Sequence, residues 1–484
     1  MMLNDLVNKI SGFCENKKIN SIPLYLIKDI SDLDSTDLIT KEQKYFLKSA
    51  FRLETDNFGF FPDKSFNLAG AIAIIKNSQE PRKSIIDQAA IISKKIPKKK
   101  WALRIIGNIE DKEISNFLLG WGLSFYQFNI DKTKNDAQSQ SLCLNEIKKL
   151  IKKKLFEKSI AELKSIFLTR DLINLPPNYL TPKKYTEIIK TSLKPFGAKI
   201  TVFEGKKLET NFPLINFVGR SSENKPALID IKWNNTKKDV PTIVLIGKGV
   251  TFDSGGLDIK PSSSMLLMKK DMGGSAVVLG IGYALMSVKC PVNLRIILPL
   301  AENAVSEKSM RPMDIIYSRN KIPVEIGNTD AEGRLLLADA LTYSQEGKES
   351  NDFVINFATL TGAARVALGT ELPALFSNNE ELGESIIRSG KEQIDPMWKM
   401  PLFSPYERFL EKNYNVISST GSAGTGGAIT AALFLKKFIN TNTKWAHVDL
   451  MAWNNSSRPG FPIGGEAMGL RNIVNMIINY CDKN

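Results

Sequence analysis

The chain of 484 residues contains a single histidine, His447. One imidazole excludes zinc sites of the His-Glu-x-x-His kind and every other site that needs two histidines. Cysteine is also scarce, and the four thiols show no spacing typical of a metal site: Cys14, Cys143, Cys290 and Cys481. Thiols this few and this dispersed favour a reduced, cytoplasmic environment.

Long apolar runs are absent as well. No stretch offers the roughly 18 apolar residues that a membrane-spanning helix needs. The most apolar run, 354–368, is interrupted by Asn356 and Arg365. Met1–Leu6 lack the charged-then-apolar pattern of a secretory signal. With 43% hydrophobic and 24% charged residues, the composition is typical of a globular protein in water. We therefore expect a cytoplasmic protein that does not contact a membrane.

Acidic residues are outnumbered, since 65 Lys and Arg face 51 Asp and Glu, giving a net charge of +14. The excess is greater in residues 1–170, which hold 29 Lys and Arg against 20 Asp and Glu. The basic clusters at 94–100 and 148–154 lack interleaved aromatic residues for base stacking. DNA binding by the N-terminal part is therefore kept as an alternative that the pattern does not favour, because lysine is common throughout.

Two domains are expected, because 484 residues exceed the size of one ordinary core. Residues 1–138 predict a small N-terminal α/β domain. Its short buried strands are expected at 68–75, 101–106 and 121–126. A helical pattern over 139–172 predicts a connecting helix, which ends before Pro176 because proline cannot continue it.

Residues 173–484 alternate strands with helices and predict a larger α/β domain. Its centre is expected to be a mixed, largely parallel sheet flanked by helices. Strands are predicted at 242–246, 293–298, 322–327 and 353–357, and helices at 274–286 and 335–341.

Three charged clusters lie at strand ends or helix starts of this larger domain. The densest is Asn328–Leu335, which places two carboxylates and an arginine at a turn between a strand and a helix. Burying such charges is costly unless something binds them. The charged residues of the three clusters include Lys248, Asp253 and Lys260 in one, Lys269, Lys270 and Asp271 in the next, and Asp330, Glu332 and Arg334 in the signature. Carboxyl ends of parallel strands share one edge of a sheet, so four carboxylates would gather there. Two divalent cations with a preference for oxygen ligands, Mn²⁺, Mg²⁺ or Zn²⁺, would neutralise them.

These residues resemble the leucyl aminopeptidase family, the two-metal exopeptidases also called cytosol aminopeptidases. Asn328-Thr-Asp-Ala-Glu-Gly-Arg-Leu335 matches the family signature without a change. Further segments are similar to other family blocks in order and spacing: 247–256, 259–261, 271–274 and 358–363. The resemblance covers about 170–484. Residues 1–135 fit the variable N-terminal domain of the family only by position and size.

The resemblance implies a site with two divalent cations, Mn²⁺ or Zn²⁺. The implied ligands are Lys248, Asp253, Asp271, Asp330 and Glu332. Asp253 and Glu332 would bridge the cations, and a water bound between them would attack the peptide carbonyl. Lys260 would stabilise the oxyanion, and Arg334 would hold a bicarbonate that acts as general base.

The resemblance also implies the substrate and the assembly. The substrate would be a peptide with a free N-terminus, whose α-amine binds one cation and Asp271. The residues expected to shape the side-chain pocket, with a preference for leucine-like residues, are Met268, Thr359, Gly362 and Met451. The segment 453–460 departs from the commonest family pattern, which leaves the substrate preference open. Family members are hexamers, so a homohexamer is expected.

Two alternatives to a metallopeptidase remain. Asp253-Ser-Gly-Gly256 is similar to the nucleophile segment of trypsin-like proteases, and Ser254 with His447 would then act as a serine hydrolase. Trypsin-like proteases are all-β, however, whereas this chain alternates strands and helices. His447 lies in an apolar strand-like segment, which is typical of a core histidine. An inactive scaffold is disfavoured because every implied ligand is present.

Overall fold

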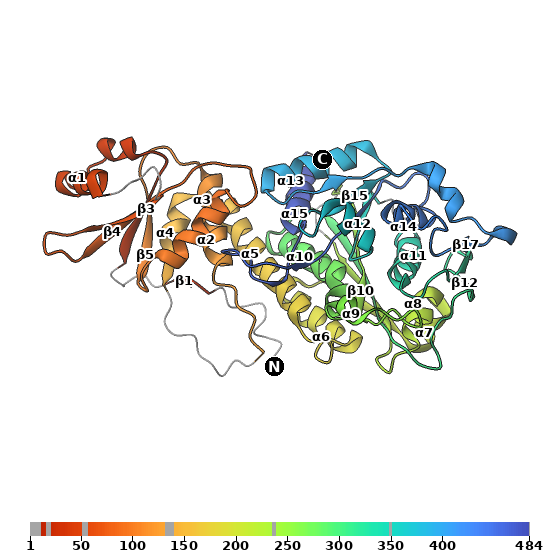
Figure 1. Ribbon diagram of the computed structural model, residues 1–484. Helices are drawn as coiled ribbons and strands as arrows, with labels where there is room; N and C mark the ends of the chain where they lie inside the picture. The colour runs from red at the N-terminus through yellow and green to blue at the C-terminus, as the bar shows by residue number, and fades with distance from the viewer. Residues whose placement is uncertain are drawn as a thin grey trace. The chain divides into compact units, whose positions relative to one another are not determined.

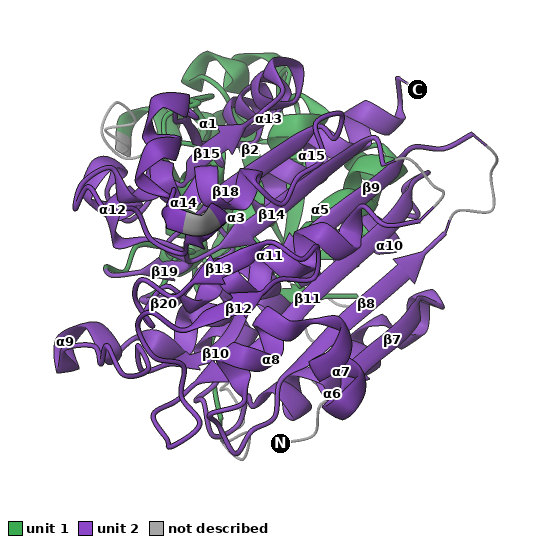
Figure 2. Ribbon diagram, turned by 90° about the vertical axis from the view of Figure 1, so that its right-hand side faces the viewer, with its two compact units in different colours: residues 1, 8–164, 456–462 green, residues 2–7, 165–455, 463–484 purple. Residues whose placement is uncertain are grey.

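The computed structural model describes residues 11–15, 21–50, 57–130, 140–234, 239–347 and 351–483. The chain divides into two compact units, shown in Figure 2. The first unit is Asn8–Lys164 with Ser456–Pro462, and the second is Ser165–Asn455 with Ile463–Asn484. Over 139–172 the structure has two helices, α4 (Leu144–Leu150) and α5 (Lys153–Asn174), after a short strand. The division into domains 1–138 and 173–484 joined by a connecting segment remains a prediction.

The first unit is built on a six-stranded sheet in the order β1-β6-β5-β2-β4-β3. Its strands are β1 (Phe13–Cys14), β2 (Ile22–Ile27), β3 (Phe58–Pro62), β4 (Leu68–Ile74), β5 (Lys100–Ile105) and β6 (Ser141–Cys143). All neighbours are parallel except the edge pair β3 and β4. Its helices before α4 are η2 (Ile30–Ser35), α1 (Lys41–Ala50), α2 (Ile85–Lys95) and α3 (Asp111–Leu123).

Both faces of this sheet are covered, because alternate side chains of a strand point to opposite sides. Leu24 and Leu26 of β2 belong to one apolar core, which also contains residues of α2 and α3. Tyr25 and Ile27 belong to a second core, with residues of η2 and α1. The strands predicted at 68–75 and 101–106 are confirmed as β4 and β5.

The strand predicted at 121–126 is wrong, because Trp121 to Leu123 form the end of helix α3. Because apolar side chains cover every face of this helix end, its sequence resembles that of a buried strand. The helix packs closely on α2, since a Cβ on Gly120 would lie closer than 3.0 Å to the backbone of Ile86. The glycines of this segment therefore serve close helix packing.

The second unit is built on a nine-stranded sheet. Its strands run in the order β16-β15-β18-β14-β9-β11-β8-β7, and β10 pairs with β11 (Figure 2). The bounds are β7 (Lys199–Glu204), β8 (Ala227–Trp233), β9 (Thr242–Gly247), β10 (Gly249–Asp253), β11 (Asn293–Asn303), β14 (Phe353–Ala358), β15 (Ala374–Ser377), β16 (Trp398–Lys399) and β18 (Trp445–Asp449). The central strands β18, β14, β9, β11 and β10 are parallel, while β7, β8 and β15 pair antiparallel. The predicted mixed, largely parallel sheet is confirmed.

Helices flank the large sheet on both sides (Figure 1). The helices of this unit after α5 are α6 (Pro182–Leu193), α7 (Gly205–Asn211), α8 (Pro213–Gly219), α9 (Ser262–Met265), η4 (Met268–Met272), α10 (Gly273–Ser287), α11 (Glu332–Ser344), α12 (Gly362–Leu368), α13 (Glu380–Gln393), α14 (Gly427–Lys436) and α15 (Leu470–Cys481). Shorter elements are η3 (Lys194–Phe196), η5 (Ser404–Phe409), η6 (Asn413–Asn415), β12 (Ile315–Tyr317), β13 (Pro323–Glu325), β17 (Ile417–Ser418), β19 (Trp453–Asn454) and β20 (Gly464–Gly465). Val244 and Ile246 of β9 share a core with residues of α8, α11 and α14.

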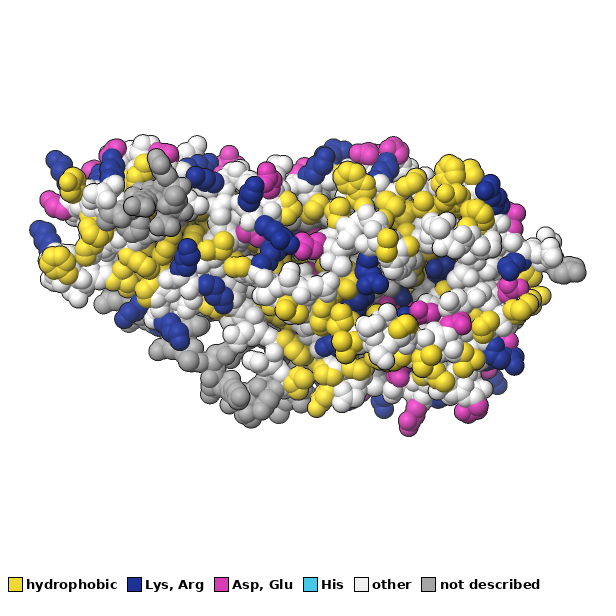
Figure 3. All heavy atoms as spheres, in the orientation of Figure 1, with side chains coloured by type: hydrophobic (Ala, Val, Ile, Leu, Met, Phe, Trp, Pro, Cys, Tyr) yellow, Lys and Arg dark blue, Asp and Glu magenta, His cyan; other side chains and the backbone are white. Residues whose placement is uncertain are grey.

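Two properties of the whole chain bear on its partners. Among the described residues, no helix has the length and apolar character required to cross a bilayer. On the face of the described residues drawn in Figure 3, Lys and Arg side chains are dispersed among acidic and apolar ones. That face therefore adds nothing in favour of DNA binding.

Candidate metal centre

The predicted ligands come from segments that follow or open the central elements of the second unit. Lys248 follows β9, and Asp253 ends β10. Asp271 lies in η4, directly before α10, and Glu332 is the first residue of α11. Because β9 and β10 both pair in parallel with β11, their carboxyl ends lie at the same edge of the sheet.

Glycines allow these segments to approach one another. A Cβ on Gly247 or on Gly274 would lie closer than 3.0 Å to backbone atoms of the neighbouring segment. The start of α10 therefore packs directly on the ends of β9 and β14. A Cβ on Gly333 would lie closer than 3.0 Å to Cε and Nζ of Lys248. The glycine of the signature thus leaves room for the lysine side chain.

Lys248 joins two of the carboxylates. Its Nζ lies 2.8 Å from Asp271 Oδ2 and 2.8 Å from Glu332 Oε1. The same ammonium donates a hydrogen bond of 3.2 Å to the carbonyl oxygen of Thr359. Lys248, Asp271 and Glu332 are all buried.

Lys260 joins the other two carboxylates. Its Nζ lies 2.8 Å from Asp253 Oδ2 and forms an ion pair with Asp330 Oδ1. Asp253, Asp330 and Glu332 each offer a carboxylate oxygen, and these oxygens all lie within 4.8 Å of one another. The structure therefore brings the five predicted ligands and Lys260 into one cluster.

Burial and mutual repulsion raise the pKa values of acidic residues in this cluster. Burial, together with the charge of Asp253, raises the pKa of Asp330 to about 6. The same two causes raise the pKa of Glu332 well above its usual value. Burial alone would lower the pKa of Lys248 and Lys260, but the surrounding carboxylates outweigh it and raise both. Carboxylates this close demand positive charge between them.

The carboxylate oxygens suit a divalent cation. Asp271 Oδ2, Asp330 Oδ1 and Glu332 Oε1 are buried, and none of them accepts a hydrogen bond of normal geometry. Each of these oxygens also lies within ion-pair distance of a lysine ammonium. A cation that prefers hard oxygen ligands, such as Mn²⁺, Mg²⁺ or Zn²⁺, would take the place of an ammonium at these oxygens.

Two side chains that the sequence analysis did not single out hold Asp253 and its loop. Asn303, at the end of β11, donates from Nδ2 to Asp253 Oδ1 at 2.8 Å and to the carbonyl of Thr329 at 3.1 Å. Thr329 Oγ1 donates to the carbonyl of Gly255 at 2.6 Å and accepts from the backbone N–H of Asp258 at 2.8 Å. The N–H of Thr329 donates to Asp258 Oδ2 at 2.7 Å. The only sequence signal was the position of Thr329 inside the signature.

Arg334 lies two residues after Glu332 on α11. Its Nη1 donates to the carbonyl of Ser419 at 2.6 Å, and its Nε is buried without a hydrogen-bond partner. Burial lowers the pKa of Arg334 to about 10, so the group stays charged at neutral pH. A buried guanidinium with an unsatisfied N–H suits a small anion.

Of the four residues expected to shape the side-chain pocket, Thr359 has the clearest contact. Its Oγ1 donates to Asp271 Oδ1 at 2.7 Å. A Cβ on Gly273 would approach both Thr359 and Ala452, so the segment after β18 lies beside the start of α10. Met268 opens η4, Gly362 opens α12, and Met451 is buried next to Ala452. Their roles in substrate binding remain predictions.

Ser254 and His447 have separate partners. Ser254 Oγ donates to the carbonyl of Asn303 at 2.8 Å. His447 is fully buried in β18, where Nδ1 lies 2.7 Å from Asn356 Nδ2. Burial lowers the pKa of His447 to about 3. A neutral histidine hydrogen-bonded within the sheet has the properties of a core residue, as its sequence context predicts, and its contacts give no support to a serine hydrolase.

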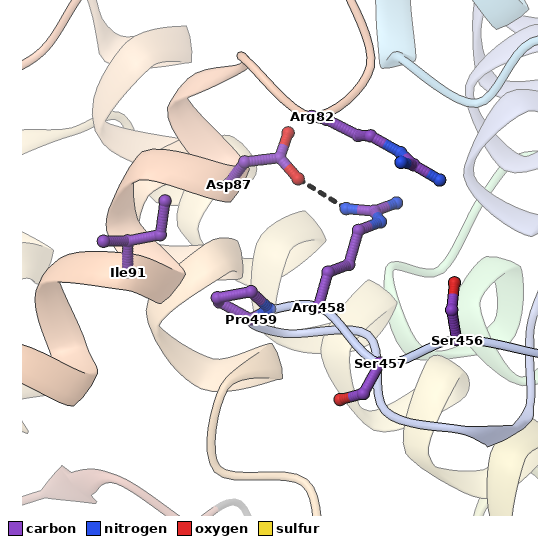
Figure 4. A pocket seen from close by; sticks show the side chains of 7 residues that line it. All are labelled: Arg82, Asp87, Ile91, Ser456, Ser457, Arg458 and Pro459. Atoms are coloured by element: carbon purple, nitrogen blue, oxygen red, sulfur yellow. Dashed lines mark hydrogen bonds and ion pairs between the residues drawn. The ribbon is translucent and has the colours of Figure 1, made fainter.

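The segment that departs from the family pattern lies partly in the first unit. Ser456 to Pro459 line a pocket there with Arg82, Asp87 and Ile91 (Figure 4). Arg458 forms an ion pair with Asp87, and the guanidinium of Arg82 lies beside it. Arg458 also stacks on the ring of Phe461. These contacts anchor the segment by its own side chains.

Comparison with known proteins identifies the family of this chain. A parallel-centred α/β unit with carboxylates and lysines clustered at the strand ends is compatible with a metal-dependent hydrolase. Residues 167–474 match the catalytic domain of the cytosol aminopeptidase family. The chain belongs to this family, whose members are metallo-aminopeptidases that remove N-terminal residues from peptides.

Individual relatives are similar in sequence to this chain over most of their length. A probable cytosol aminopeptidase of Wolbachia pipientis is 38% identical over 76% of this chain and 75% of its own. One of Rickettsia felis is 41% identical over 68% of this chain and 66% of its own. The crystal structure of the Coxiella burnetii cytosol aminopeptidase is 37% identical and superposes with a TM-score of 0.85, covering 97% of this chain and 99% of that one. The bottromycin maturation enzyme BotP, in complex with Mn, is 25% identical with a TM-score of 0.82, covering 96% and 100%.

Proposed function

We propose that this aminopeptidase holds two divalent cations, Mn²⁺ or Zn²⁺. The proposed ligands are Lys248, Asp253, Asp271, Asp330 and Glu332. The observation that carries the proposal is the close group formed by Asp253, Asp330 and Glu332, whose carboxylate oxygens all lie within 4.8 Å of one another. When bound, the cations would activate a water and polarise the scissile carbonyl. Lys248 would leave its present ion pairs and act as a neutral amine ligand, because adjacent cations disfavour its proton.

Lys260 supplies the positive charge for the oxyanion in this proposal. Its ammonium already lies among carboxylates at the edge of the cluster, and these raise its pKa. It therefore keeps its proton under the conditions in which the other groups titrate. A fixed ammonium in a partly buried site stabilises developing negative charge more strongly than water does.

Arg334 is proposed to hold a bicarbonate that acts as general base. Its support is the buried Nε without an acceptor, beside an Nη1 fixed on the carbonyl of Ser419. The remaining guanidinium donors match a planar anion with two acceptor oxygens. With His447 neutral and buried, such an anion would supply the base that no side chain of the cluster provides.

The substrate is proposed to be a peptide with a free N-terminus. Asp271 would receive the α-amine, which restricts cleavage to the first residue. Met268, Thr359, Gly362 and Met451 would line the pocket for a leucine-like side chain. The few, dispersed cysteines support a cytoplasmic role in peptide turnover.

A homohexamer is proposed for the assembly. Its support is an exposed apolar strip on and beside β12, an edge strand of a small sheet of the second unit. Met313, Ile315 and Tyr317 are 77%, 54% and 61% exposed. Such strips mark contact surfaces between chains. Light scattering would give six chain masses if the proposal holds, and one chain mass would refute it.

The first experiment is hydrolysis of leucine p-nitroanilide by metal-stripped protein, with and without added Mn²⁺ or Zn²⁺. Activity should return with the cation, and Glu332→Gln, which keeps the shape of the ligand but removes its charge, should abolish it. Ser254→Ala serves as the discriminating control and should stay active. Activity that survives chelation but is lost in Ser254→Ala would refute the metal mechanism.

A further inference from the structure

Lys270 is a buried lysine that the proposed chemistry does not use. It lies in η4 between Lys269 and Asp271, and only 5% of it is exposed. Lys269 turns away, because its Nζ donates to the carbonyl of Asn174 at 2.7 Å and lies over the ring of Trp453. Within the described part of the chain, the ammonium of Lys270 has no ion pair and no hydrogen bond. An ammonium without a charged partner, on a side chain that is otherwise buried, suits a substrate carboxylate.

Charged groups of both signs act on the ammonium of Lys270. They are Asp271, Lys248, Arg365 and Asp449. Two of the four are cations, and Lys248 is engaged by its own carboxylates. Asp449 is engaged too, since its oxygens accept hydrogen bonds from the N–H groups of Leu360 and Thr361 and from the hydroxyl of Thr361.

The same neighbours belong to the segment that is expected to shape the side-chain pocket. Thr359 donates to Asp271, the residue directly after Lys270. A Cβ on Gly362 would lie 3.4 Å from Arg365 Nη2. Lys270 therefore adjoins, through Asp271, the segment that begins at Thr359, which is expected to shape the side-chain pocket.

We propose that Lys270 is a specificity-determining residue that binds the side-chain carboxylate of an N-terminal glutamate or aspartate. The proposal rests on the proposed function, because it places Lys270 beside the pocket of a peptide substrate. A substrate carboxylate would supply the partner that the chain does not provide, in a charge-assisted hydrogen bond. Apolar walls such as Met268 and Met451 would contact the methylene groups of the same side chain. The pocket would then accept acidic as well as leucine-like residues.

The test compares two substrates that differ only in charge, the p-nitroanilides of glutamate and glutamine. For the wild-type enzyme, kcat/KM for glutamate should exceed that for glutamine by about tenfold. Lys270→Met removes the charge with little change in length and should bring the ratio to about one. Lys206→Met makes the same change on an exposed lysine of α7 and should keep the wild-type ratio. An unchanged ratio in Lys270→Met would refute the proposal.

A binding measurement separates this proposal from the proposed function. Titration calorimetry of the Mn²⁺-loaded protein with free L-glutamate and L-glutamine needs no turnover. L-glutamate should bind about tenfold more tightly than L-glutamine to the wild type and equally to Lys270→Met. If no peptide is hydrolysed but this preference is found, the peptidase assignment fails and the role of Lys270 stands. If the wild type shows no preference for glutamate in either assay, the role of Lys270 is refuted, whether or not the variant folds.

Discussion

Gly333 has no side chain, and this leaves space for Lys248 in the proposed metal centre. A Cβ at this position would overlap Cε and Nζ of Lys248, which pairs with Glu332 at the start of α11. Gly333→Ala should displace the lysine and lower both metal affinity and kcat/KM by at least about tenfold, because ligands misplaced by an ångström lose much of their effect. Calorimetric titration with Mn²⁺ measures the metal affinity, and a leucine p-nitroanilide assay measures kcat/KM.

Gly383→Ala is the matched control for that change. Gly383 lies in α13, and a Cβ there would make ordinary contacts of 3.5 Å or more. Alanine is the better helix former, so this variant should be at least as stable as the wild type and equally active. Equal losses in both variants would show that Gly333 has no special relation to Lys248.

His447 gives a prediction about stability in acid. Its pKa is about 3 in the folded protein, because of burial, and about 6.5 in an unfolded chain. Below pH 6.5 the imidazole of His447 becomes protonated in the unfolded state but stays neutral in the folded state. The contribution of this group to the free energy of unfolding therefore falls by about 1.4 kcal/mol per pH unit between pH 6.5 and 3.

His447→Gln removes this titration, and the chain has no other histidine. The variant loses packing against Trp445 and Phe376, so it should be less stable than the wild type at pH 7. The difference should narrow as the pH falls, which urea unfolding at pH 7, 6 and 5 would show. A difference that does not change with pH would contradict a buried neutral imidazole.

At the scale of elements, Thr329 joins the loop after β10 to the turn before α11. Thr329→Val keeps the shape but removes the donor to Gly255 and the acceptor of the Asp258 N–H. A buried N–H left without a partner costs about 1–3 kcal/mol. The variant should unfold at lower urea concentration and lose kcat, since the loop also carries Lys260. Thr329→Ser keeps the hydroxyl and should restore most of the stability and most of kcat. Failure of this rescue would contradict the hydrogen-bonding role.

Elements with a strong periodic pattern were predictable from sequence. The strands expected at 242–246 and 353–357 are β9 and β14, and the helix expected at 274–286 is α10. In contrast, the sequence predicts a strand at the end of α3, because the side chains there are buried on every face and show no helical period. The helical stretch over 139–172 is two helices, since Ile151 and Lys152 interrupt it. Short interruptions of this kind depend on tertiary packing rather than on local propensity.

The site was predictable to the extent that its residues share one signature or one kind of side chain. The charged ligands stand in three short clusters, and the structure brings them together. Asn303, by contrast, lies at the end of a strand, and nothing in its sequence neighbourhood indicates a contact with Asp253. Lys270 looked like one of two adjacent lysines, and only the burial of its side chain sets it apart. Roles that depend on burial and on partners far away in the chain follow from the fold alone.

At the scale of the whole molecule, the stability of the second unit should depend on metal. Asp253, Asp271, Asp330 and Glu332 carry up to four negative charges, and Lys248 and Lys260 offset two of them. A cation that binds only the folded protein adds about 2.7 kcal/mol to the free energy of unfolding at a concentration one hundred times its Kd. Saturating Mn²⁺ or Zn²⁺ should therefore raise the Tm of metal-stripped protein by several degrees in differential scanning calorimetry. Glu332→Gln should lose most of this increase, because it weakens a ligand of the cluster without removing its bulk. An equal rise in Tm in both proteins would place the stabilising cation elsewhere, whereas no rise in the wild type would contradict a metal centre at this edge of the sheet.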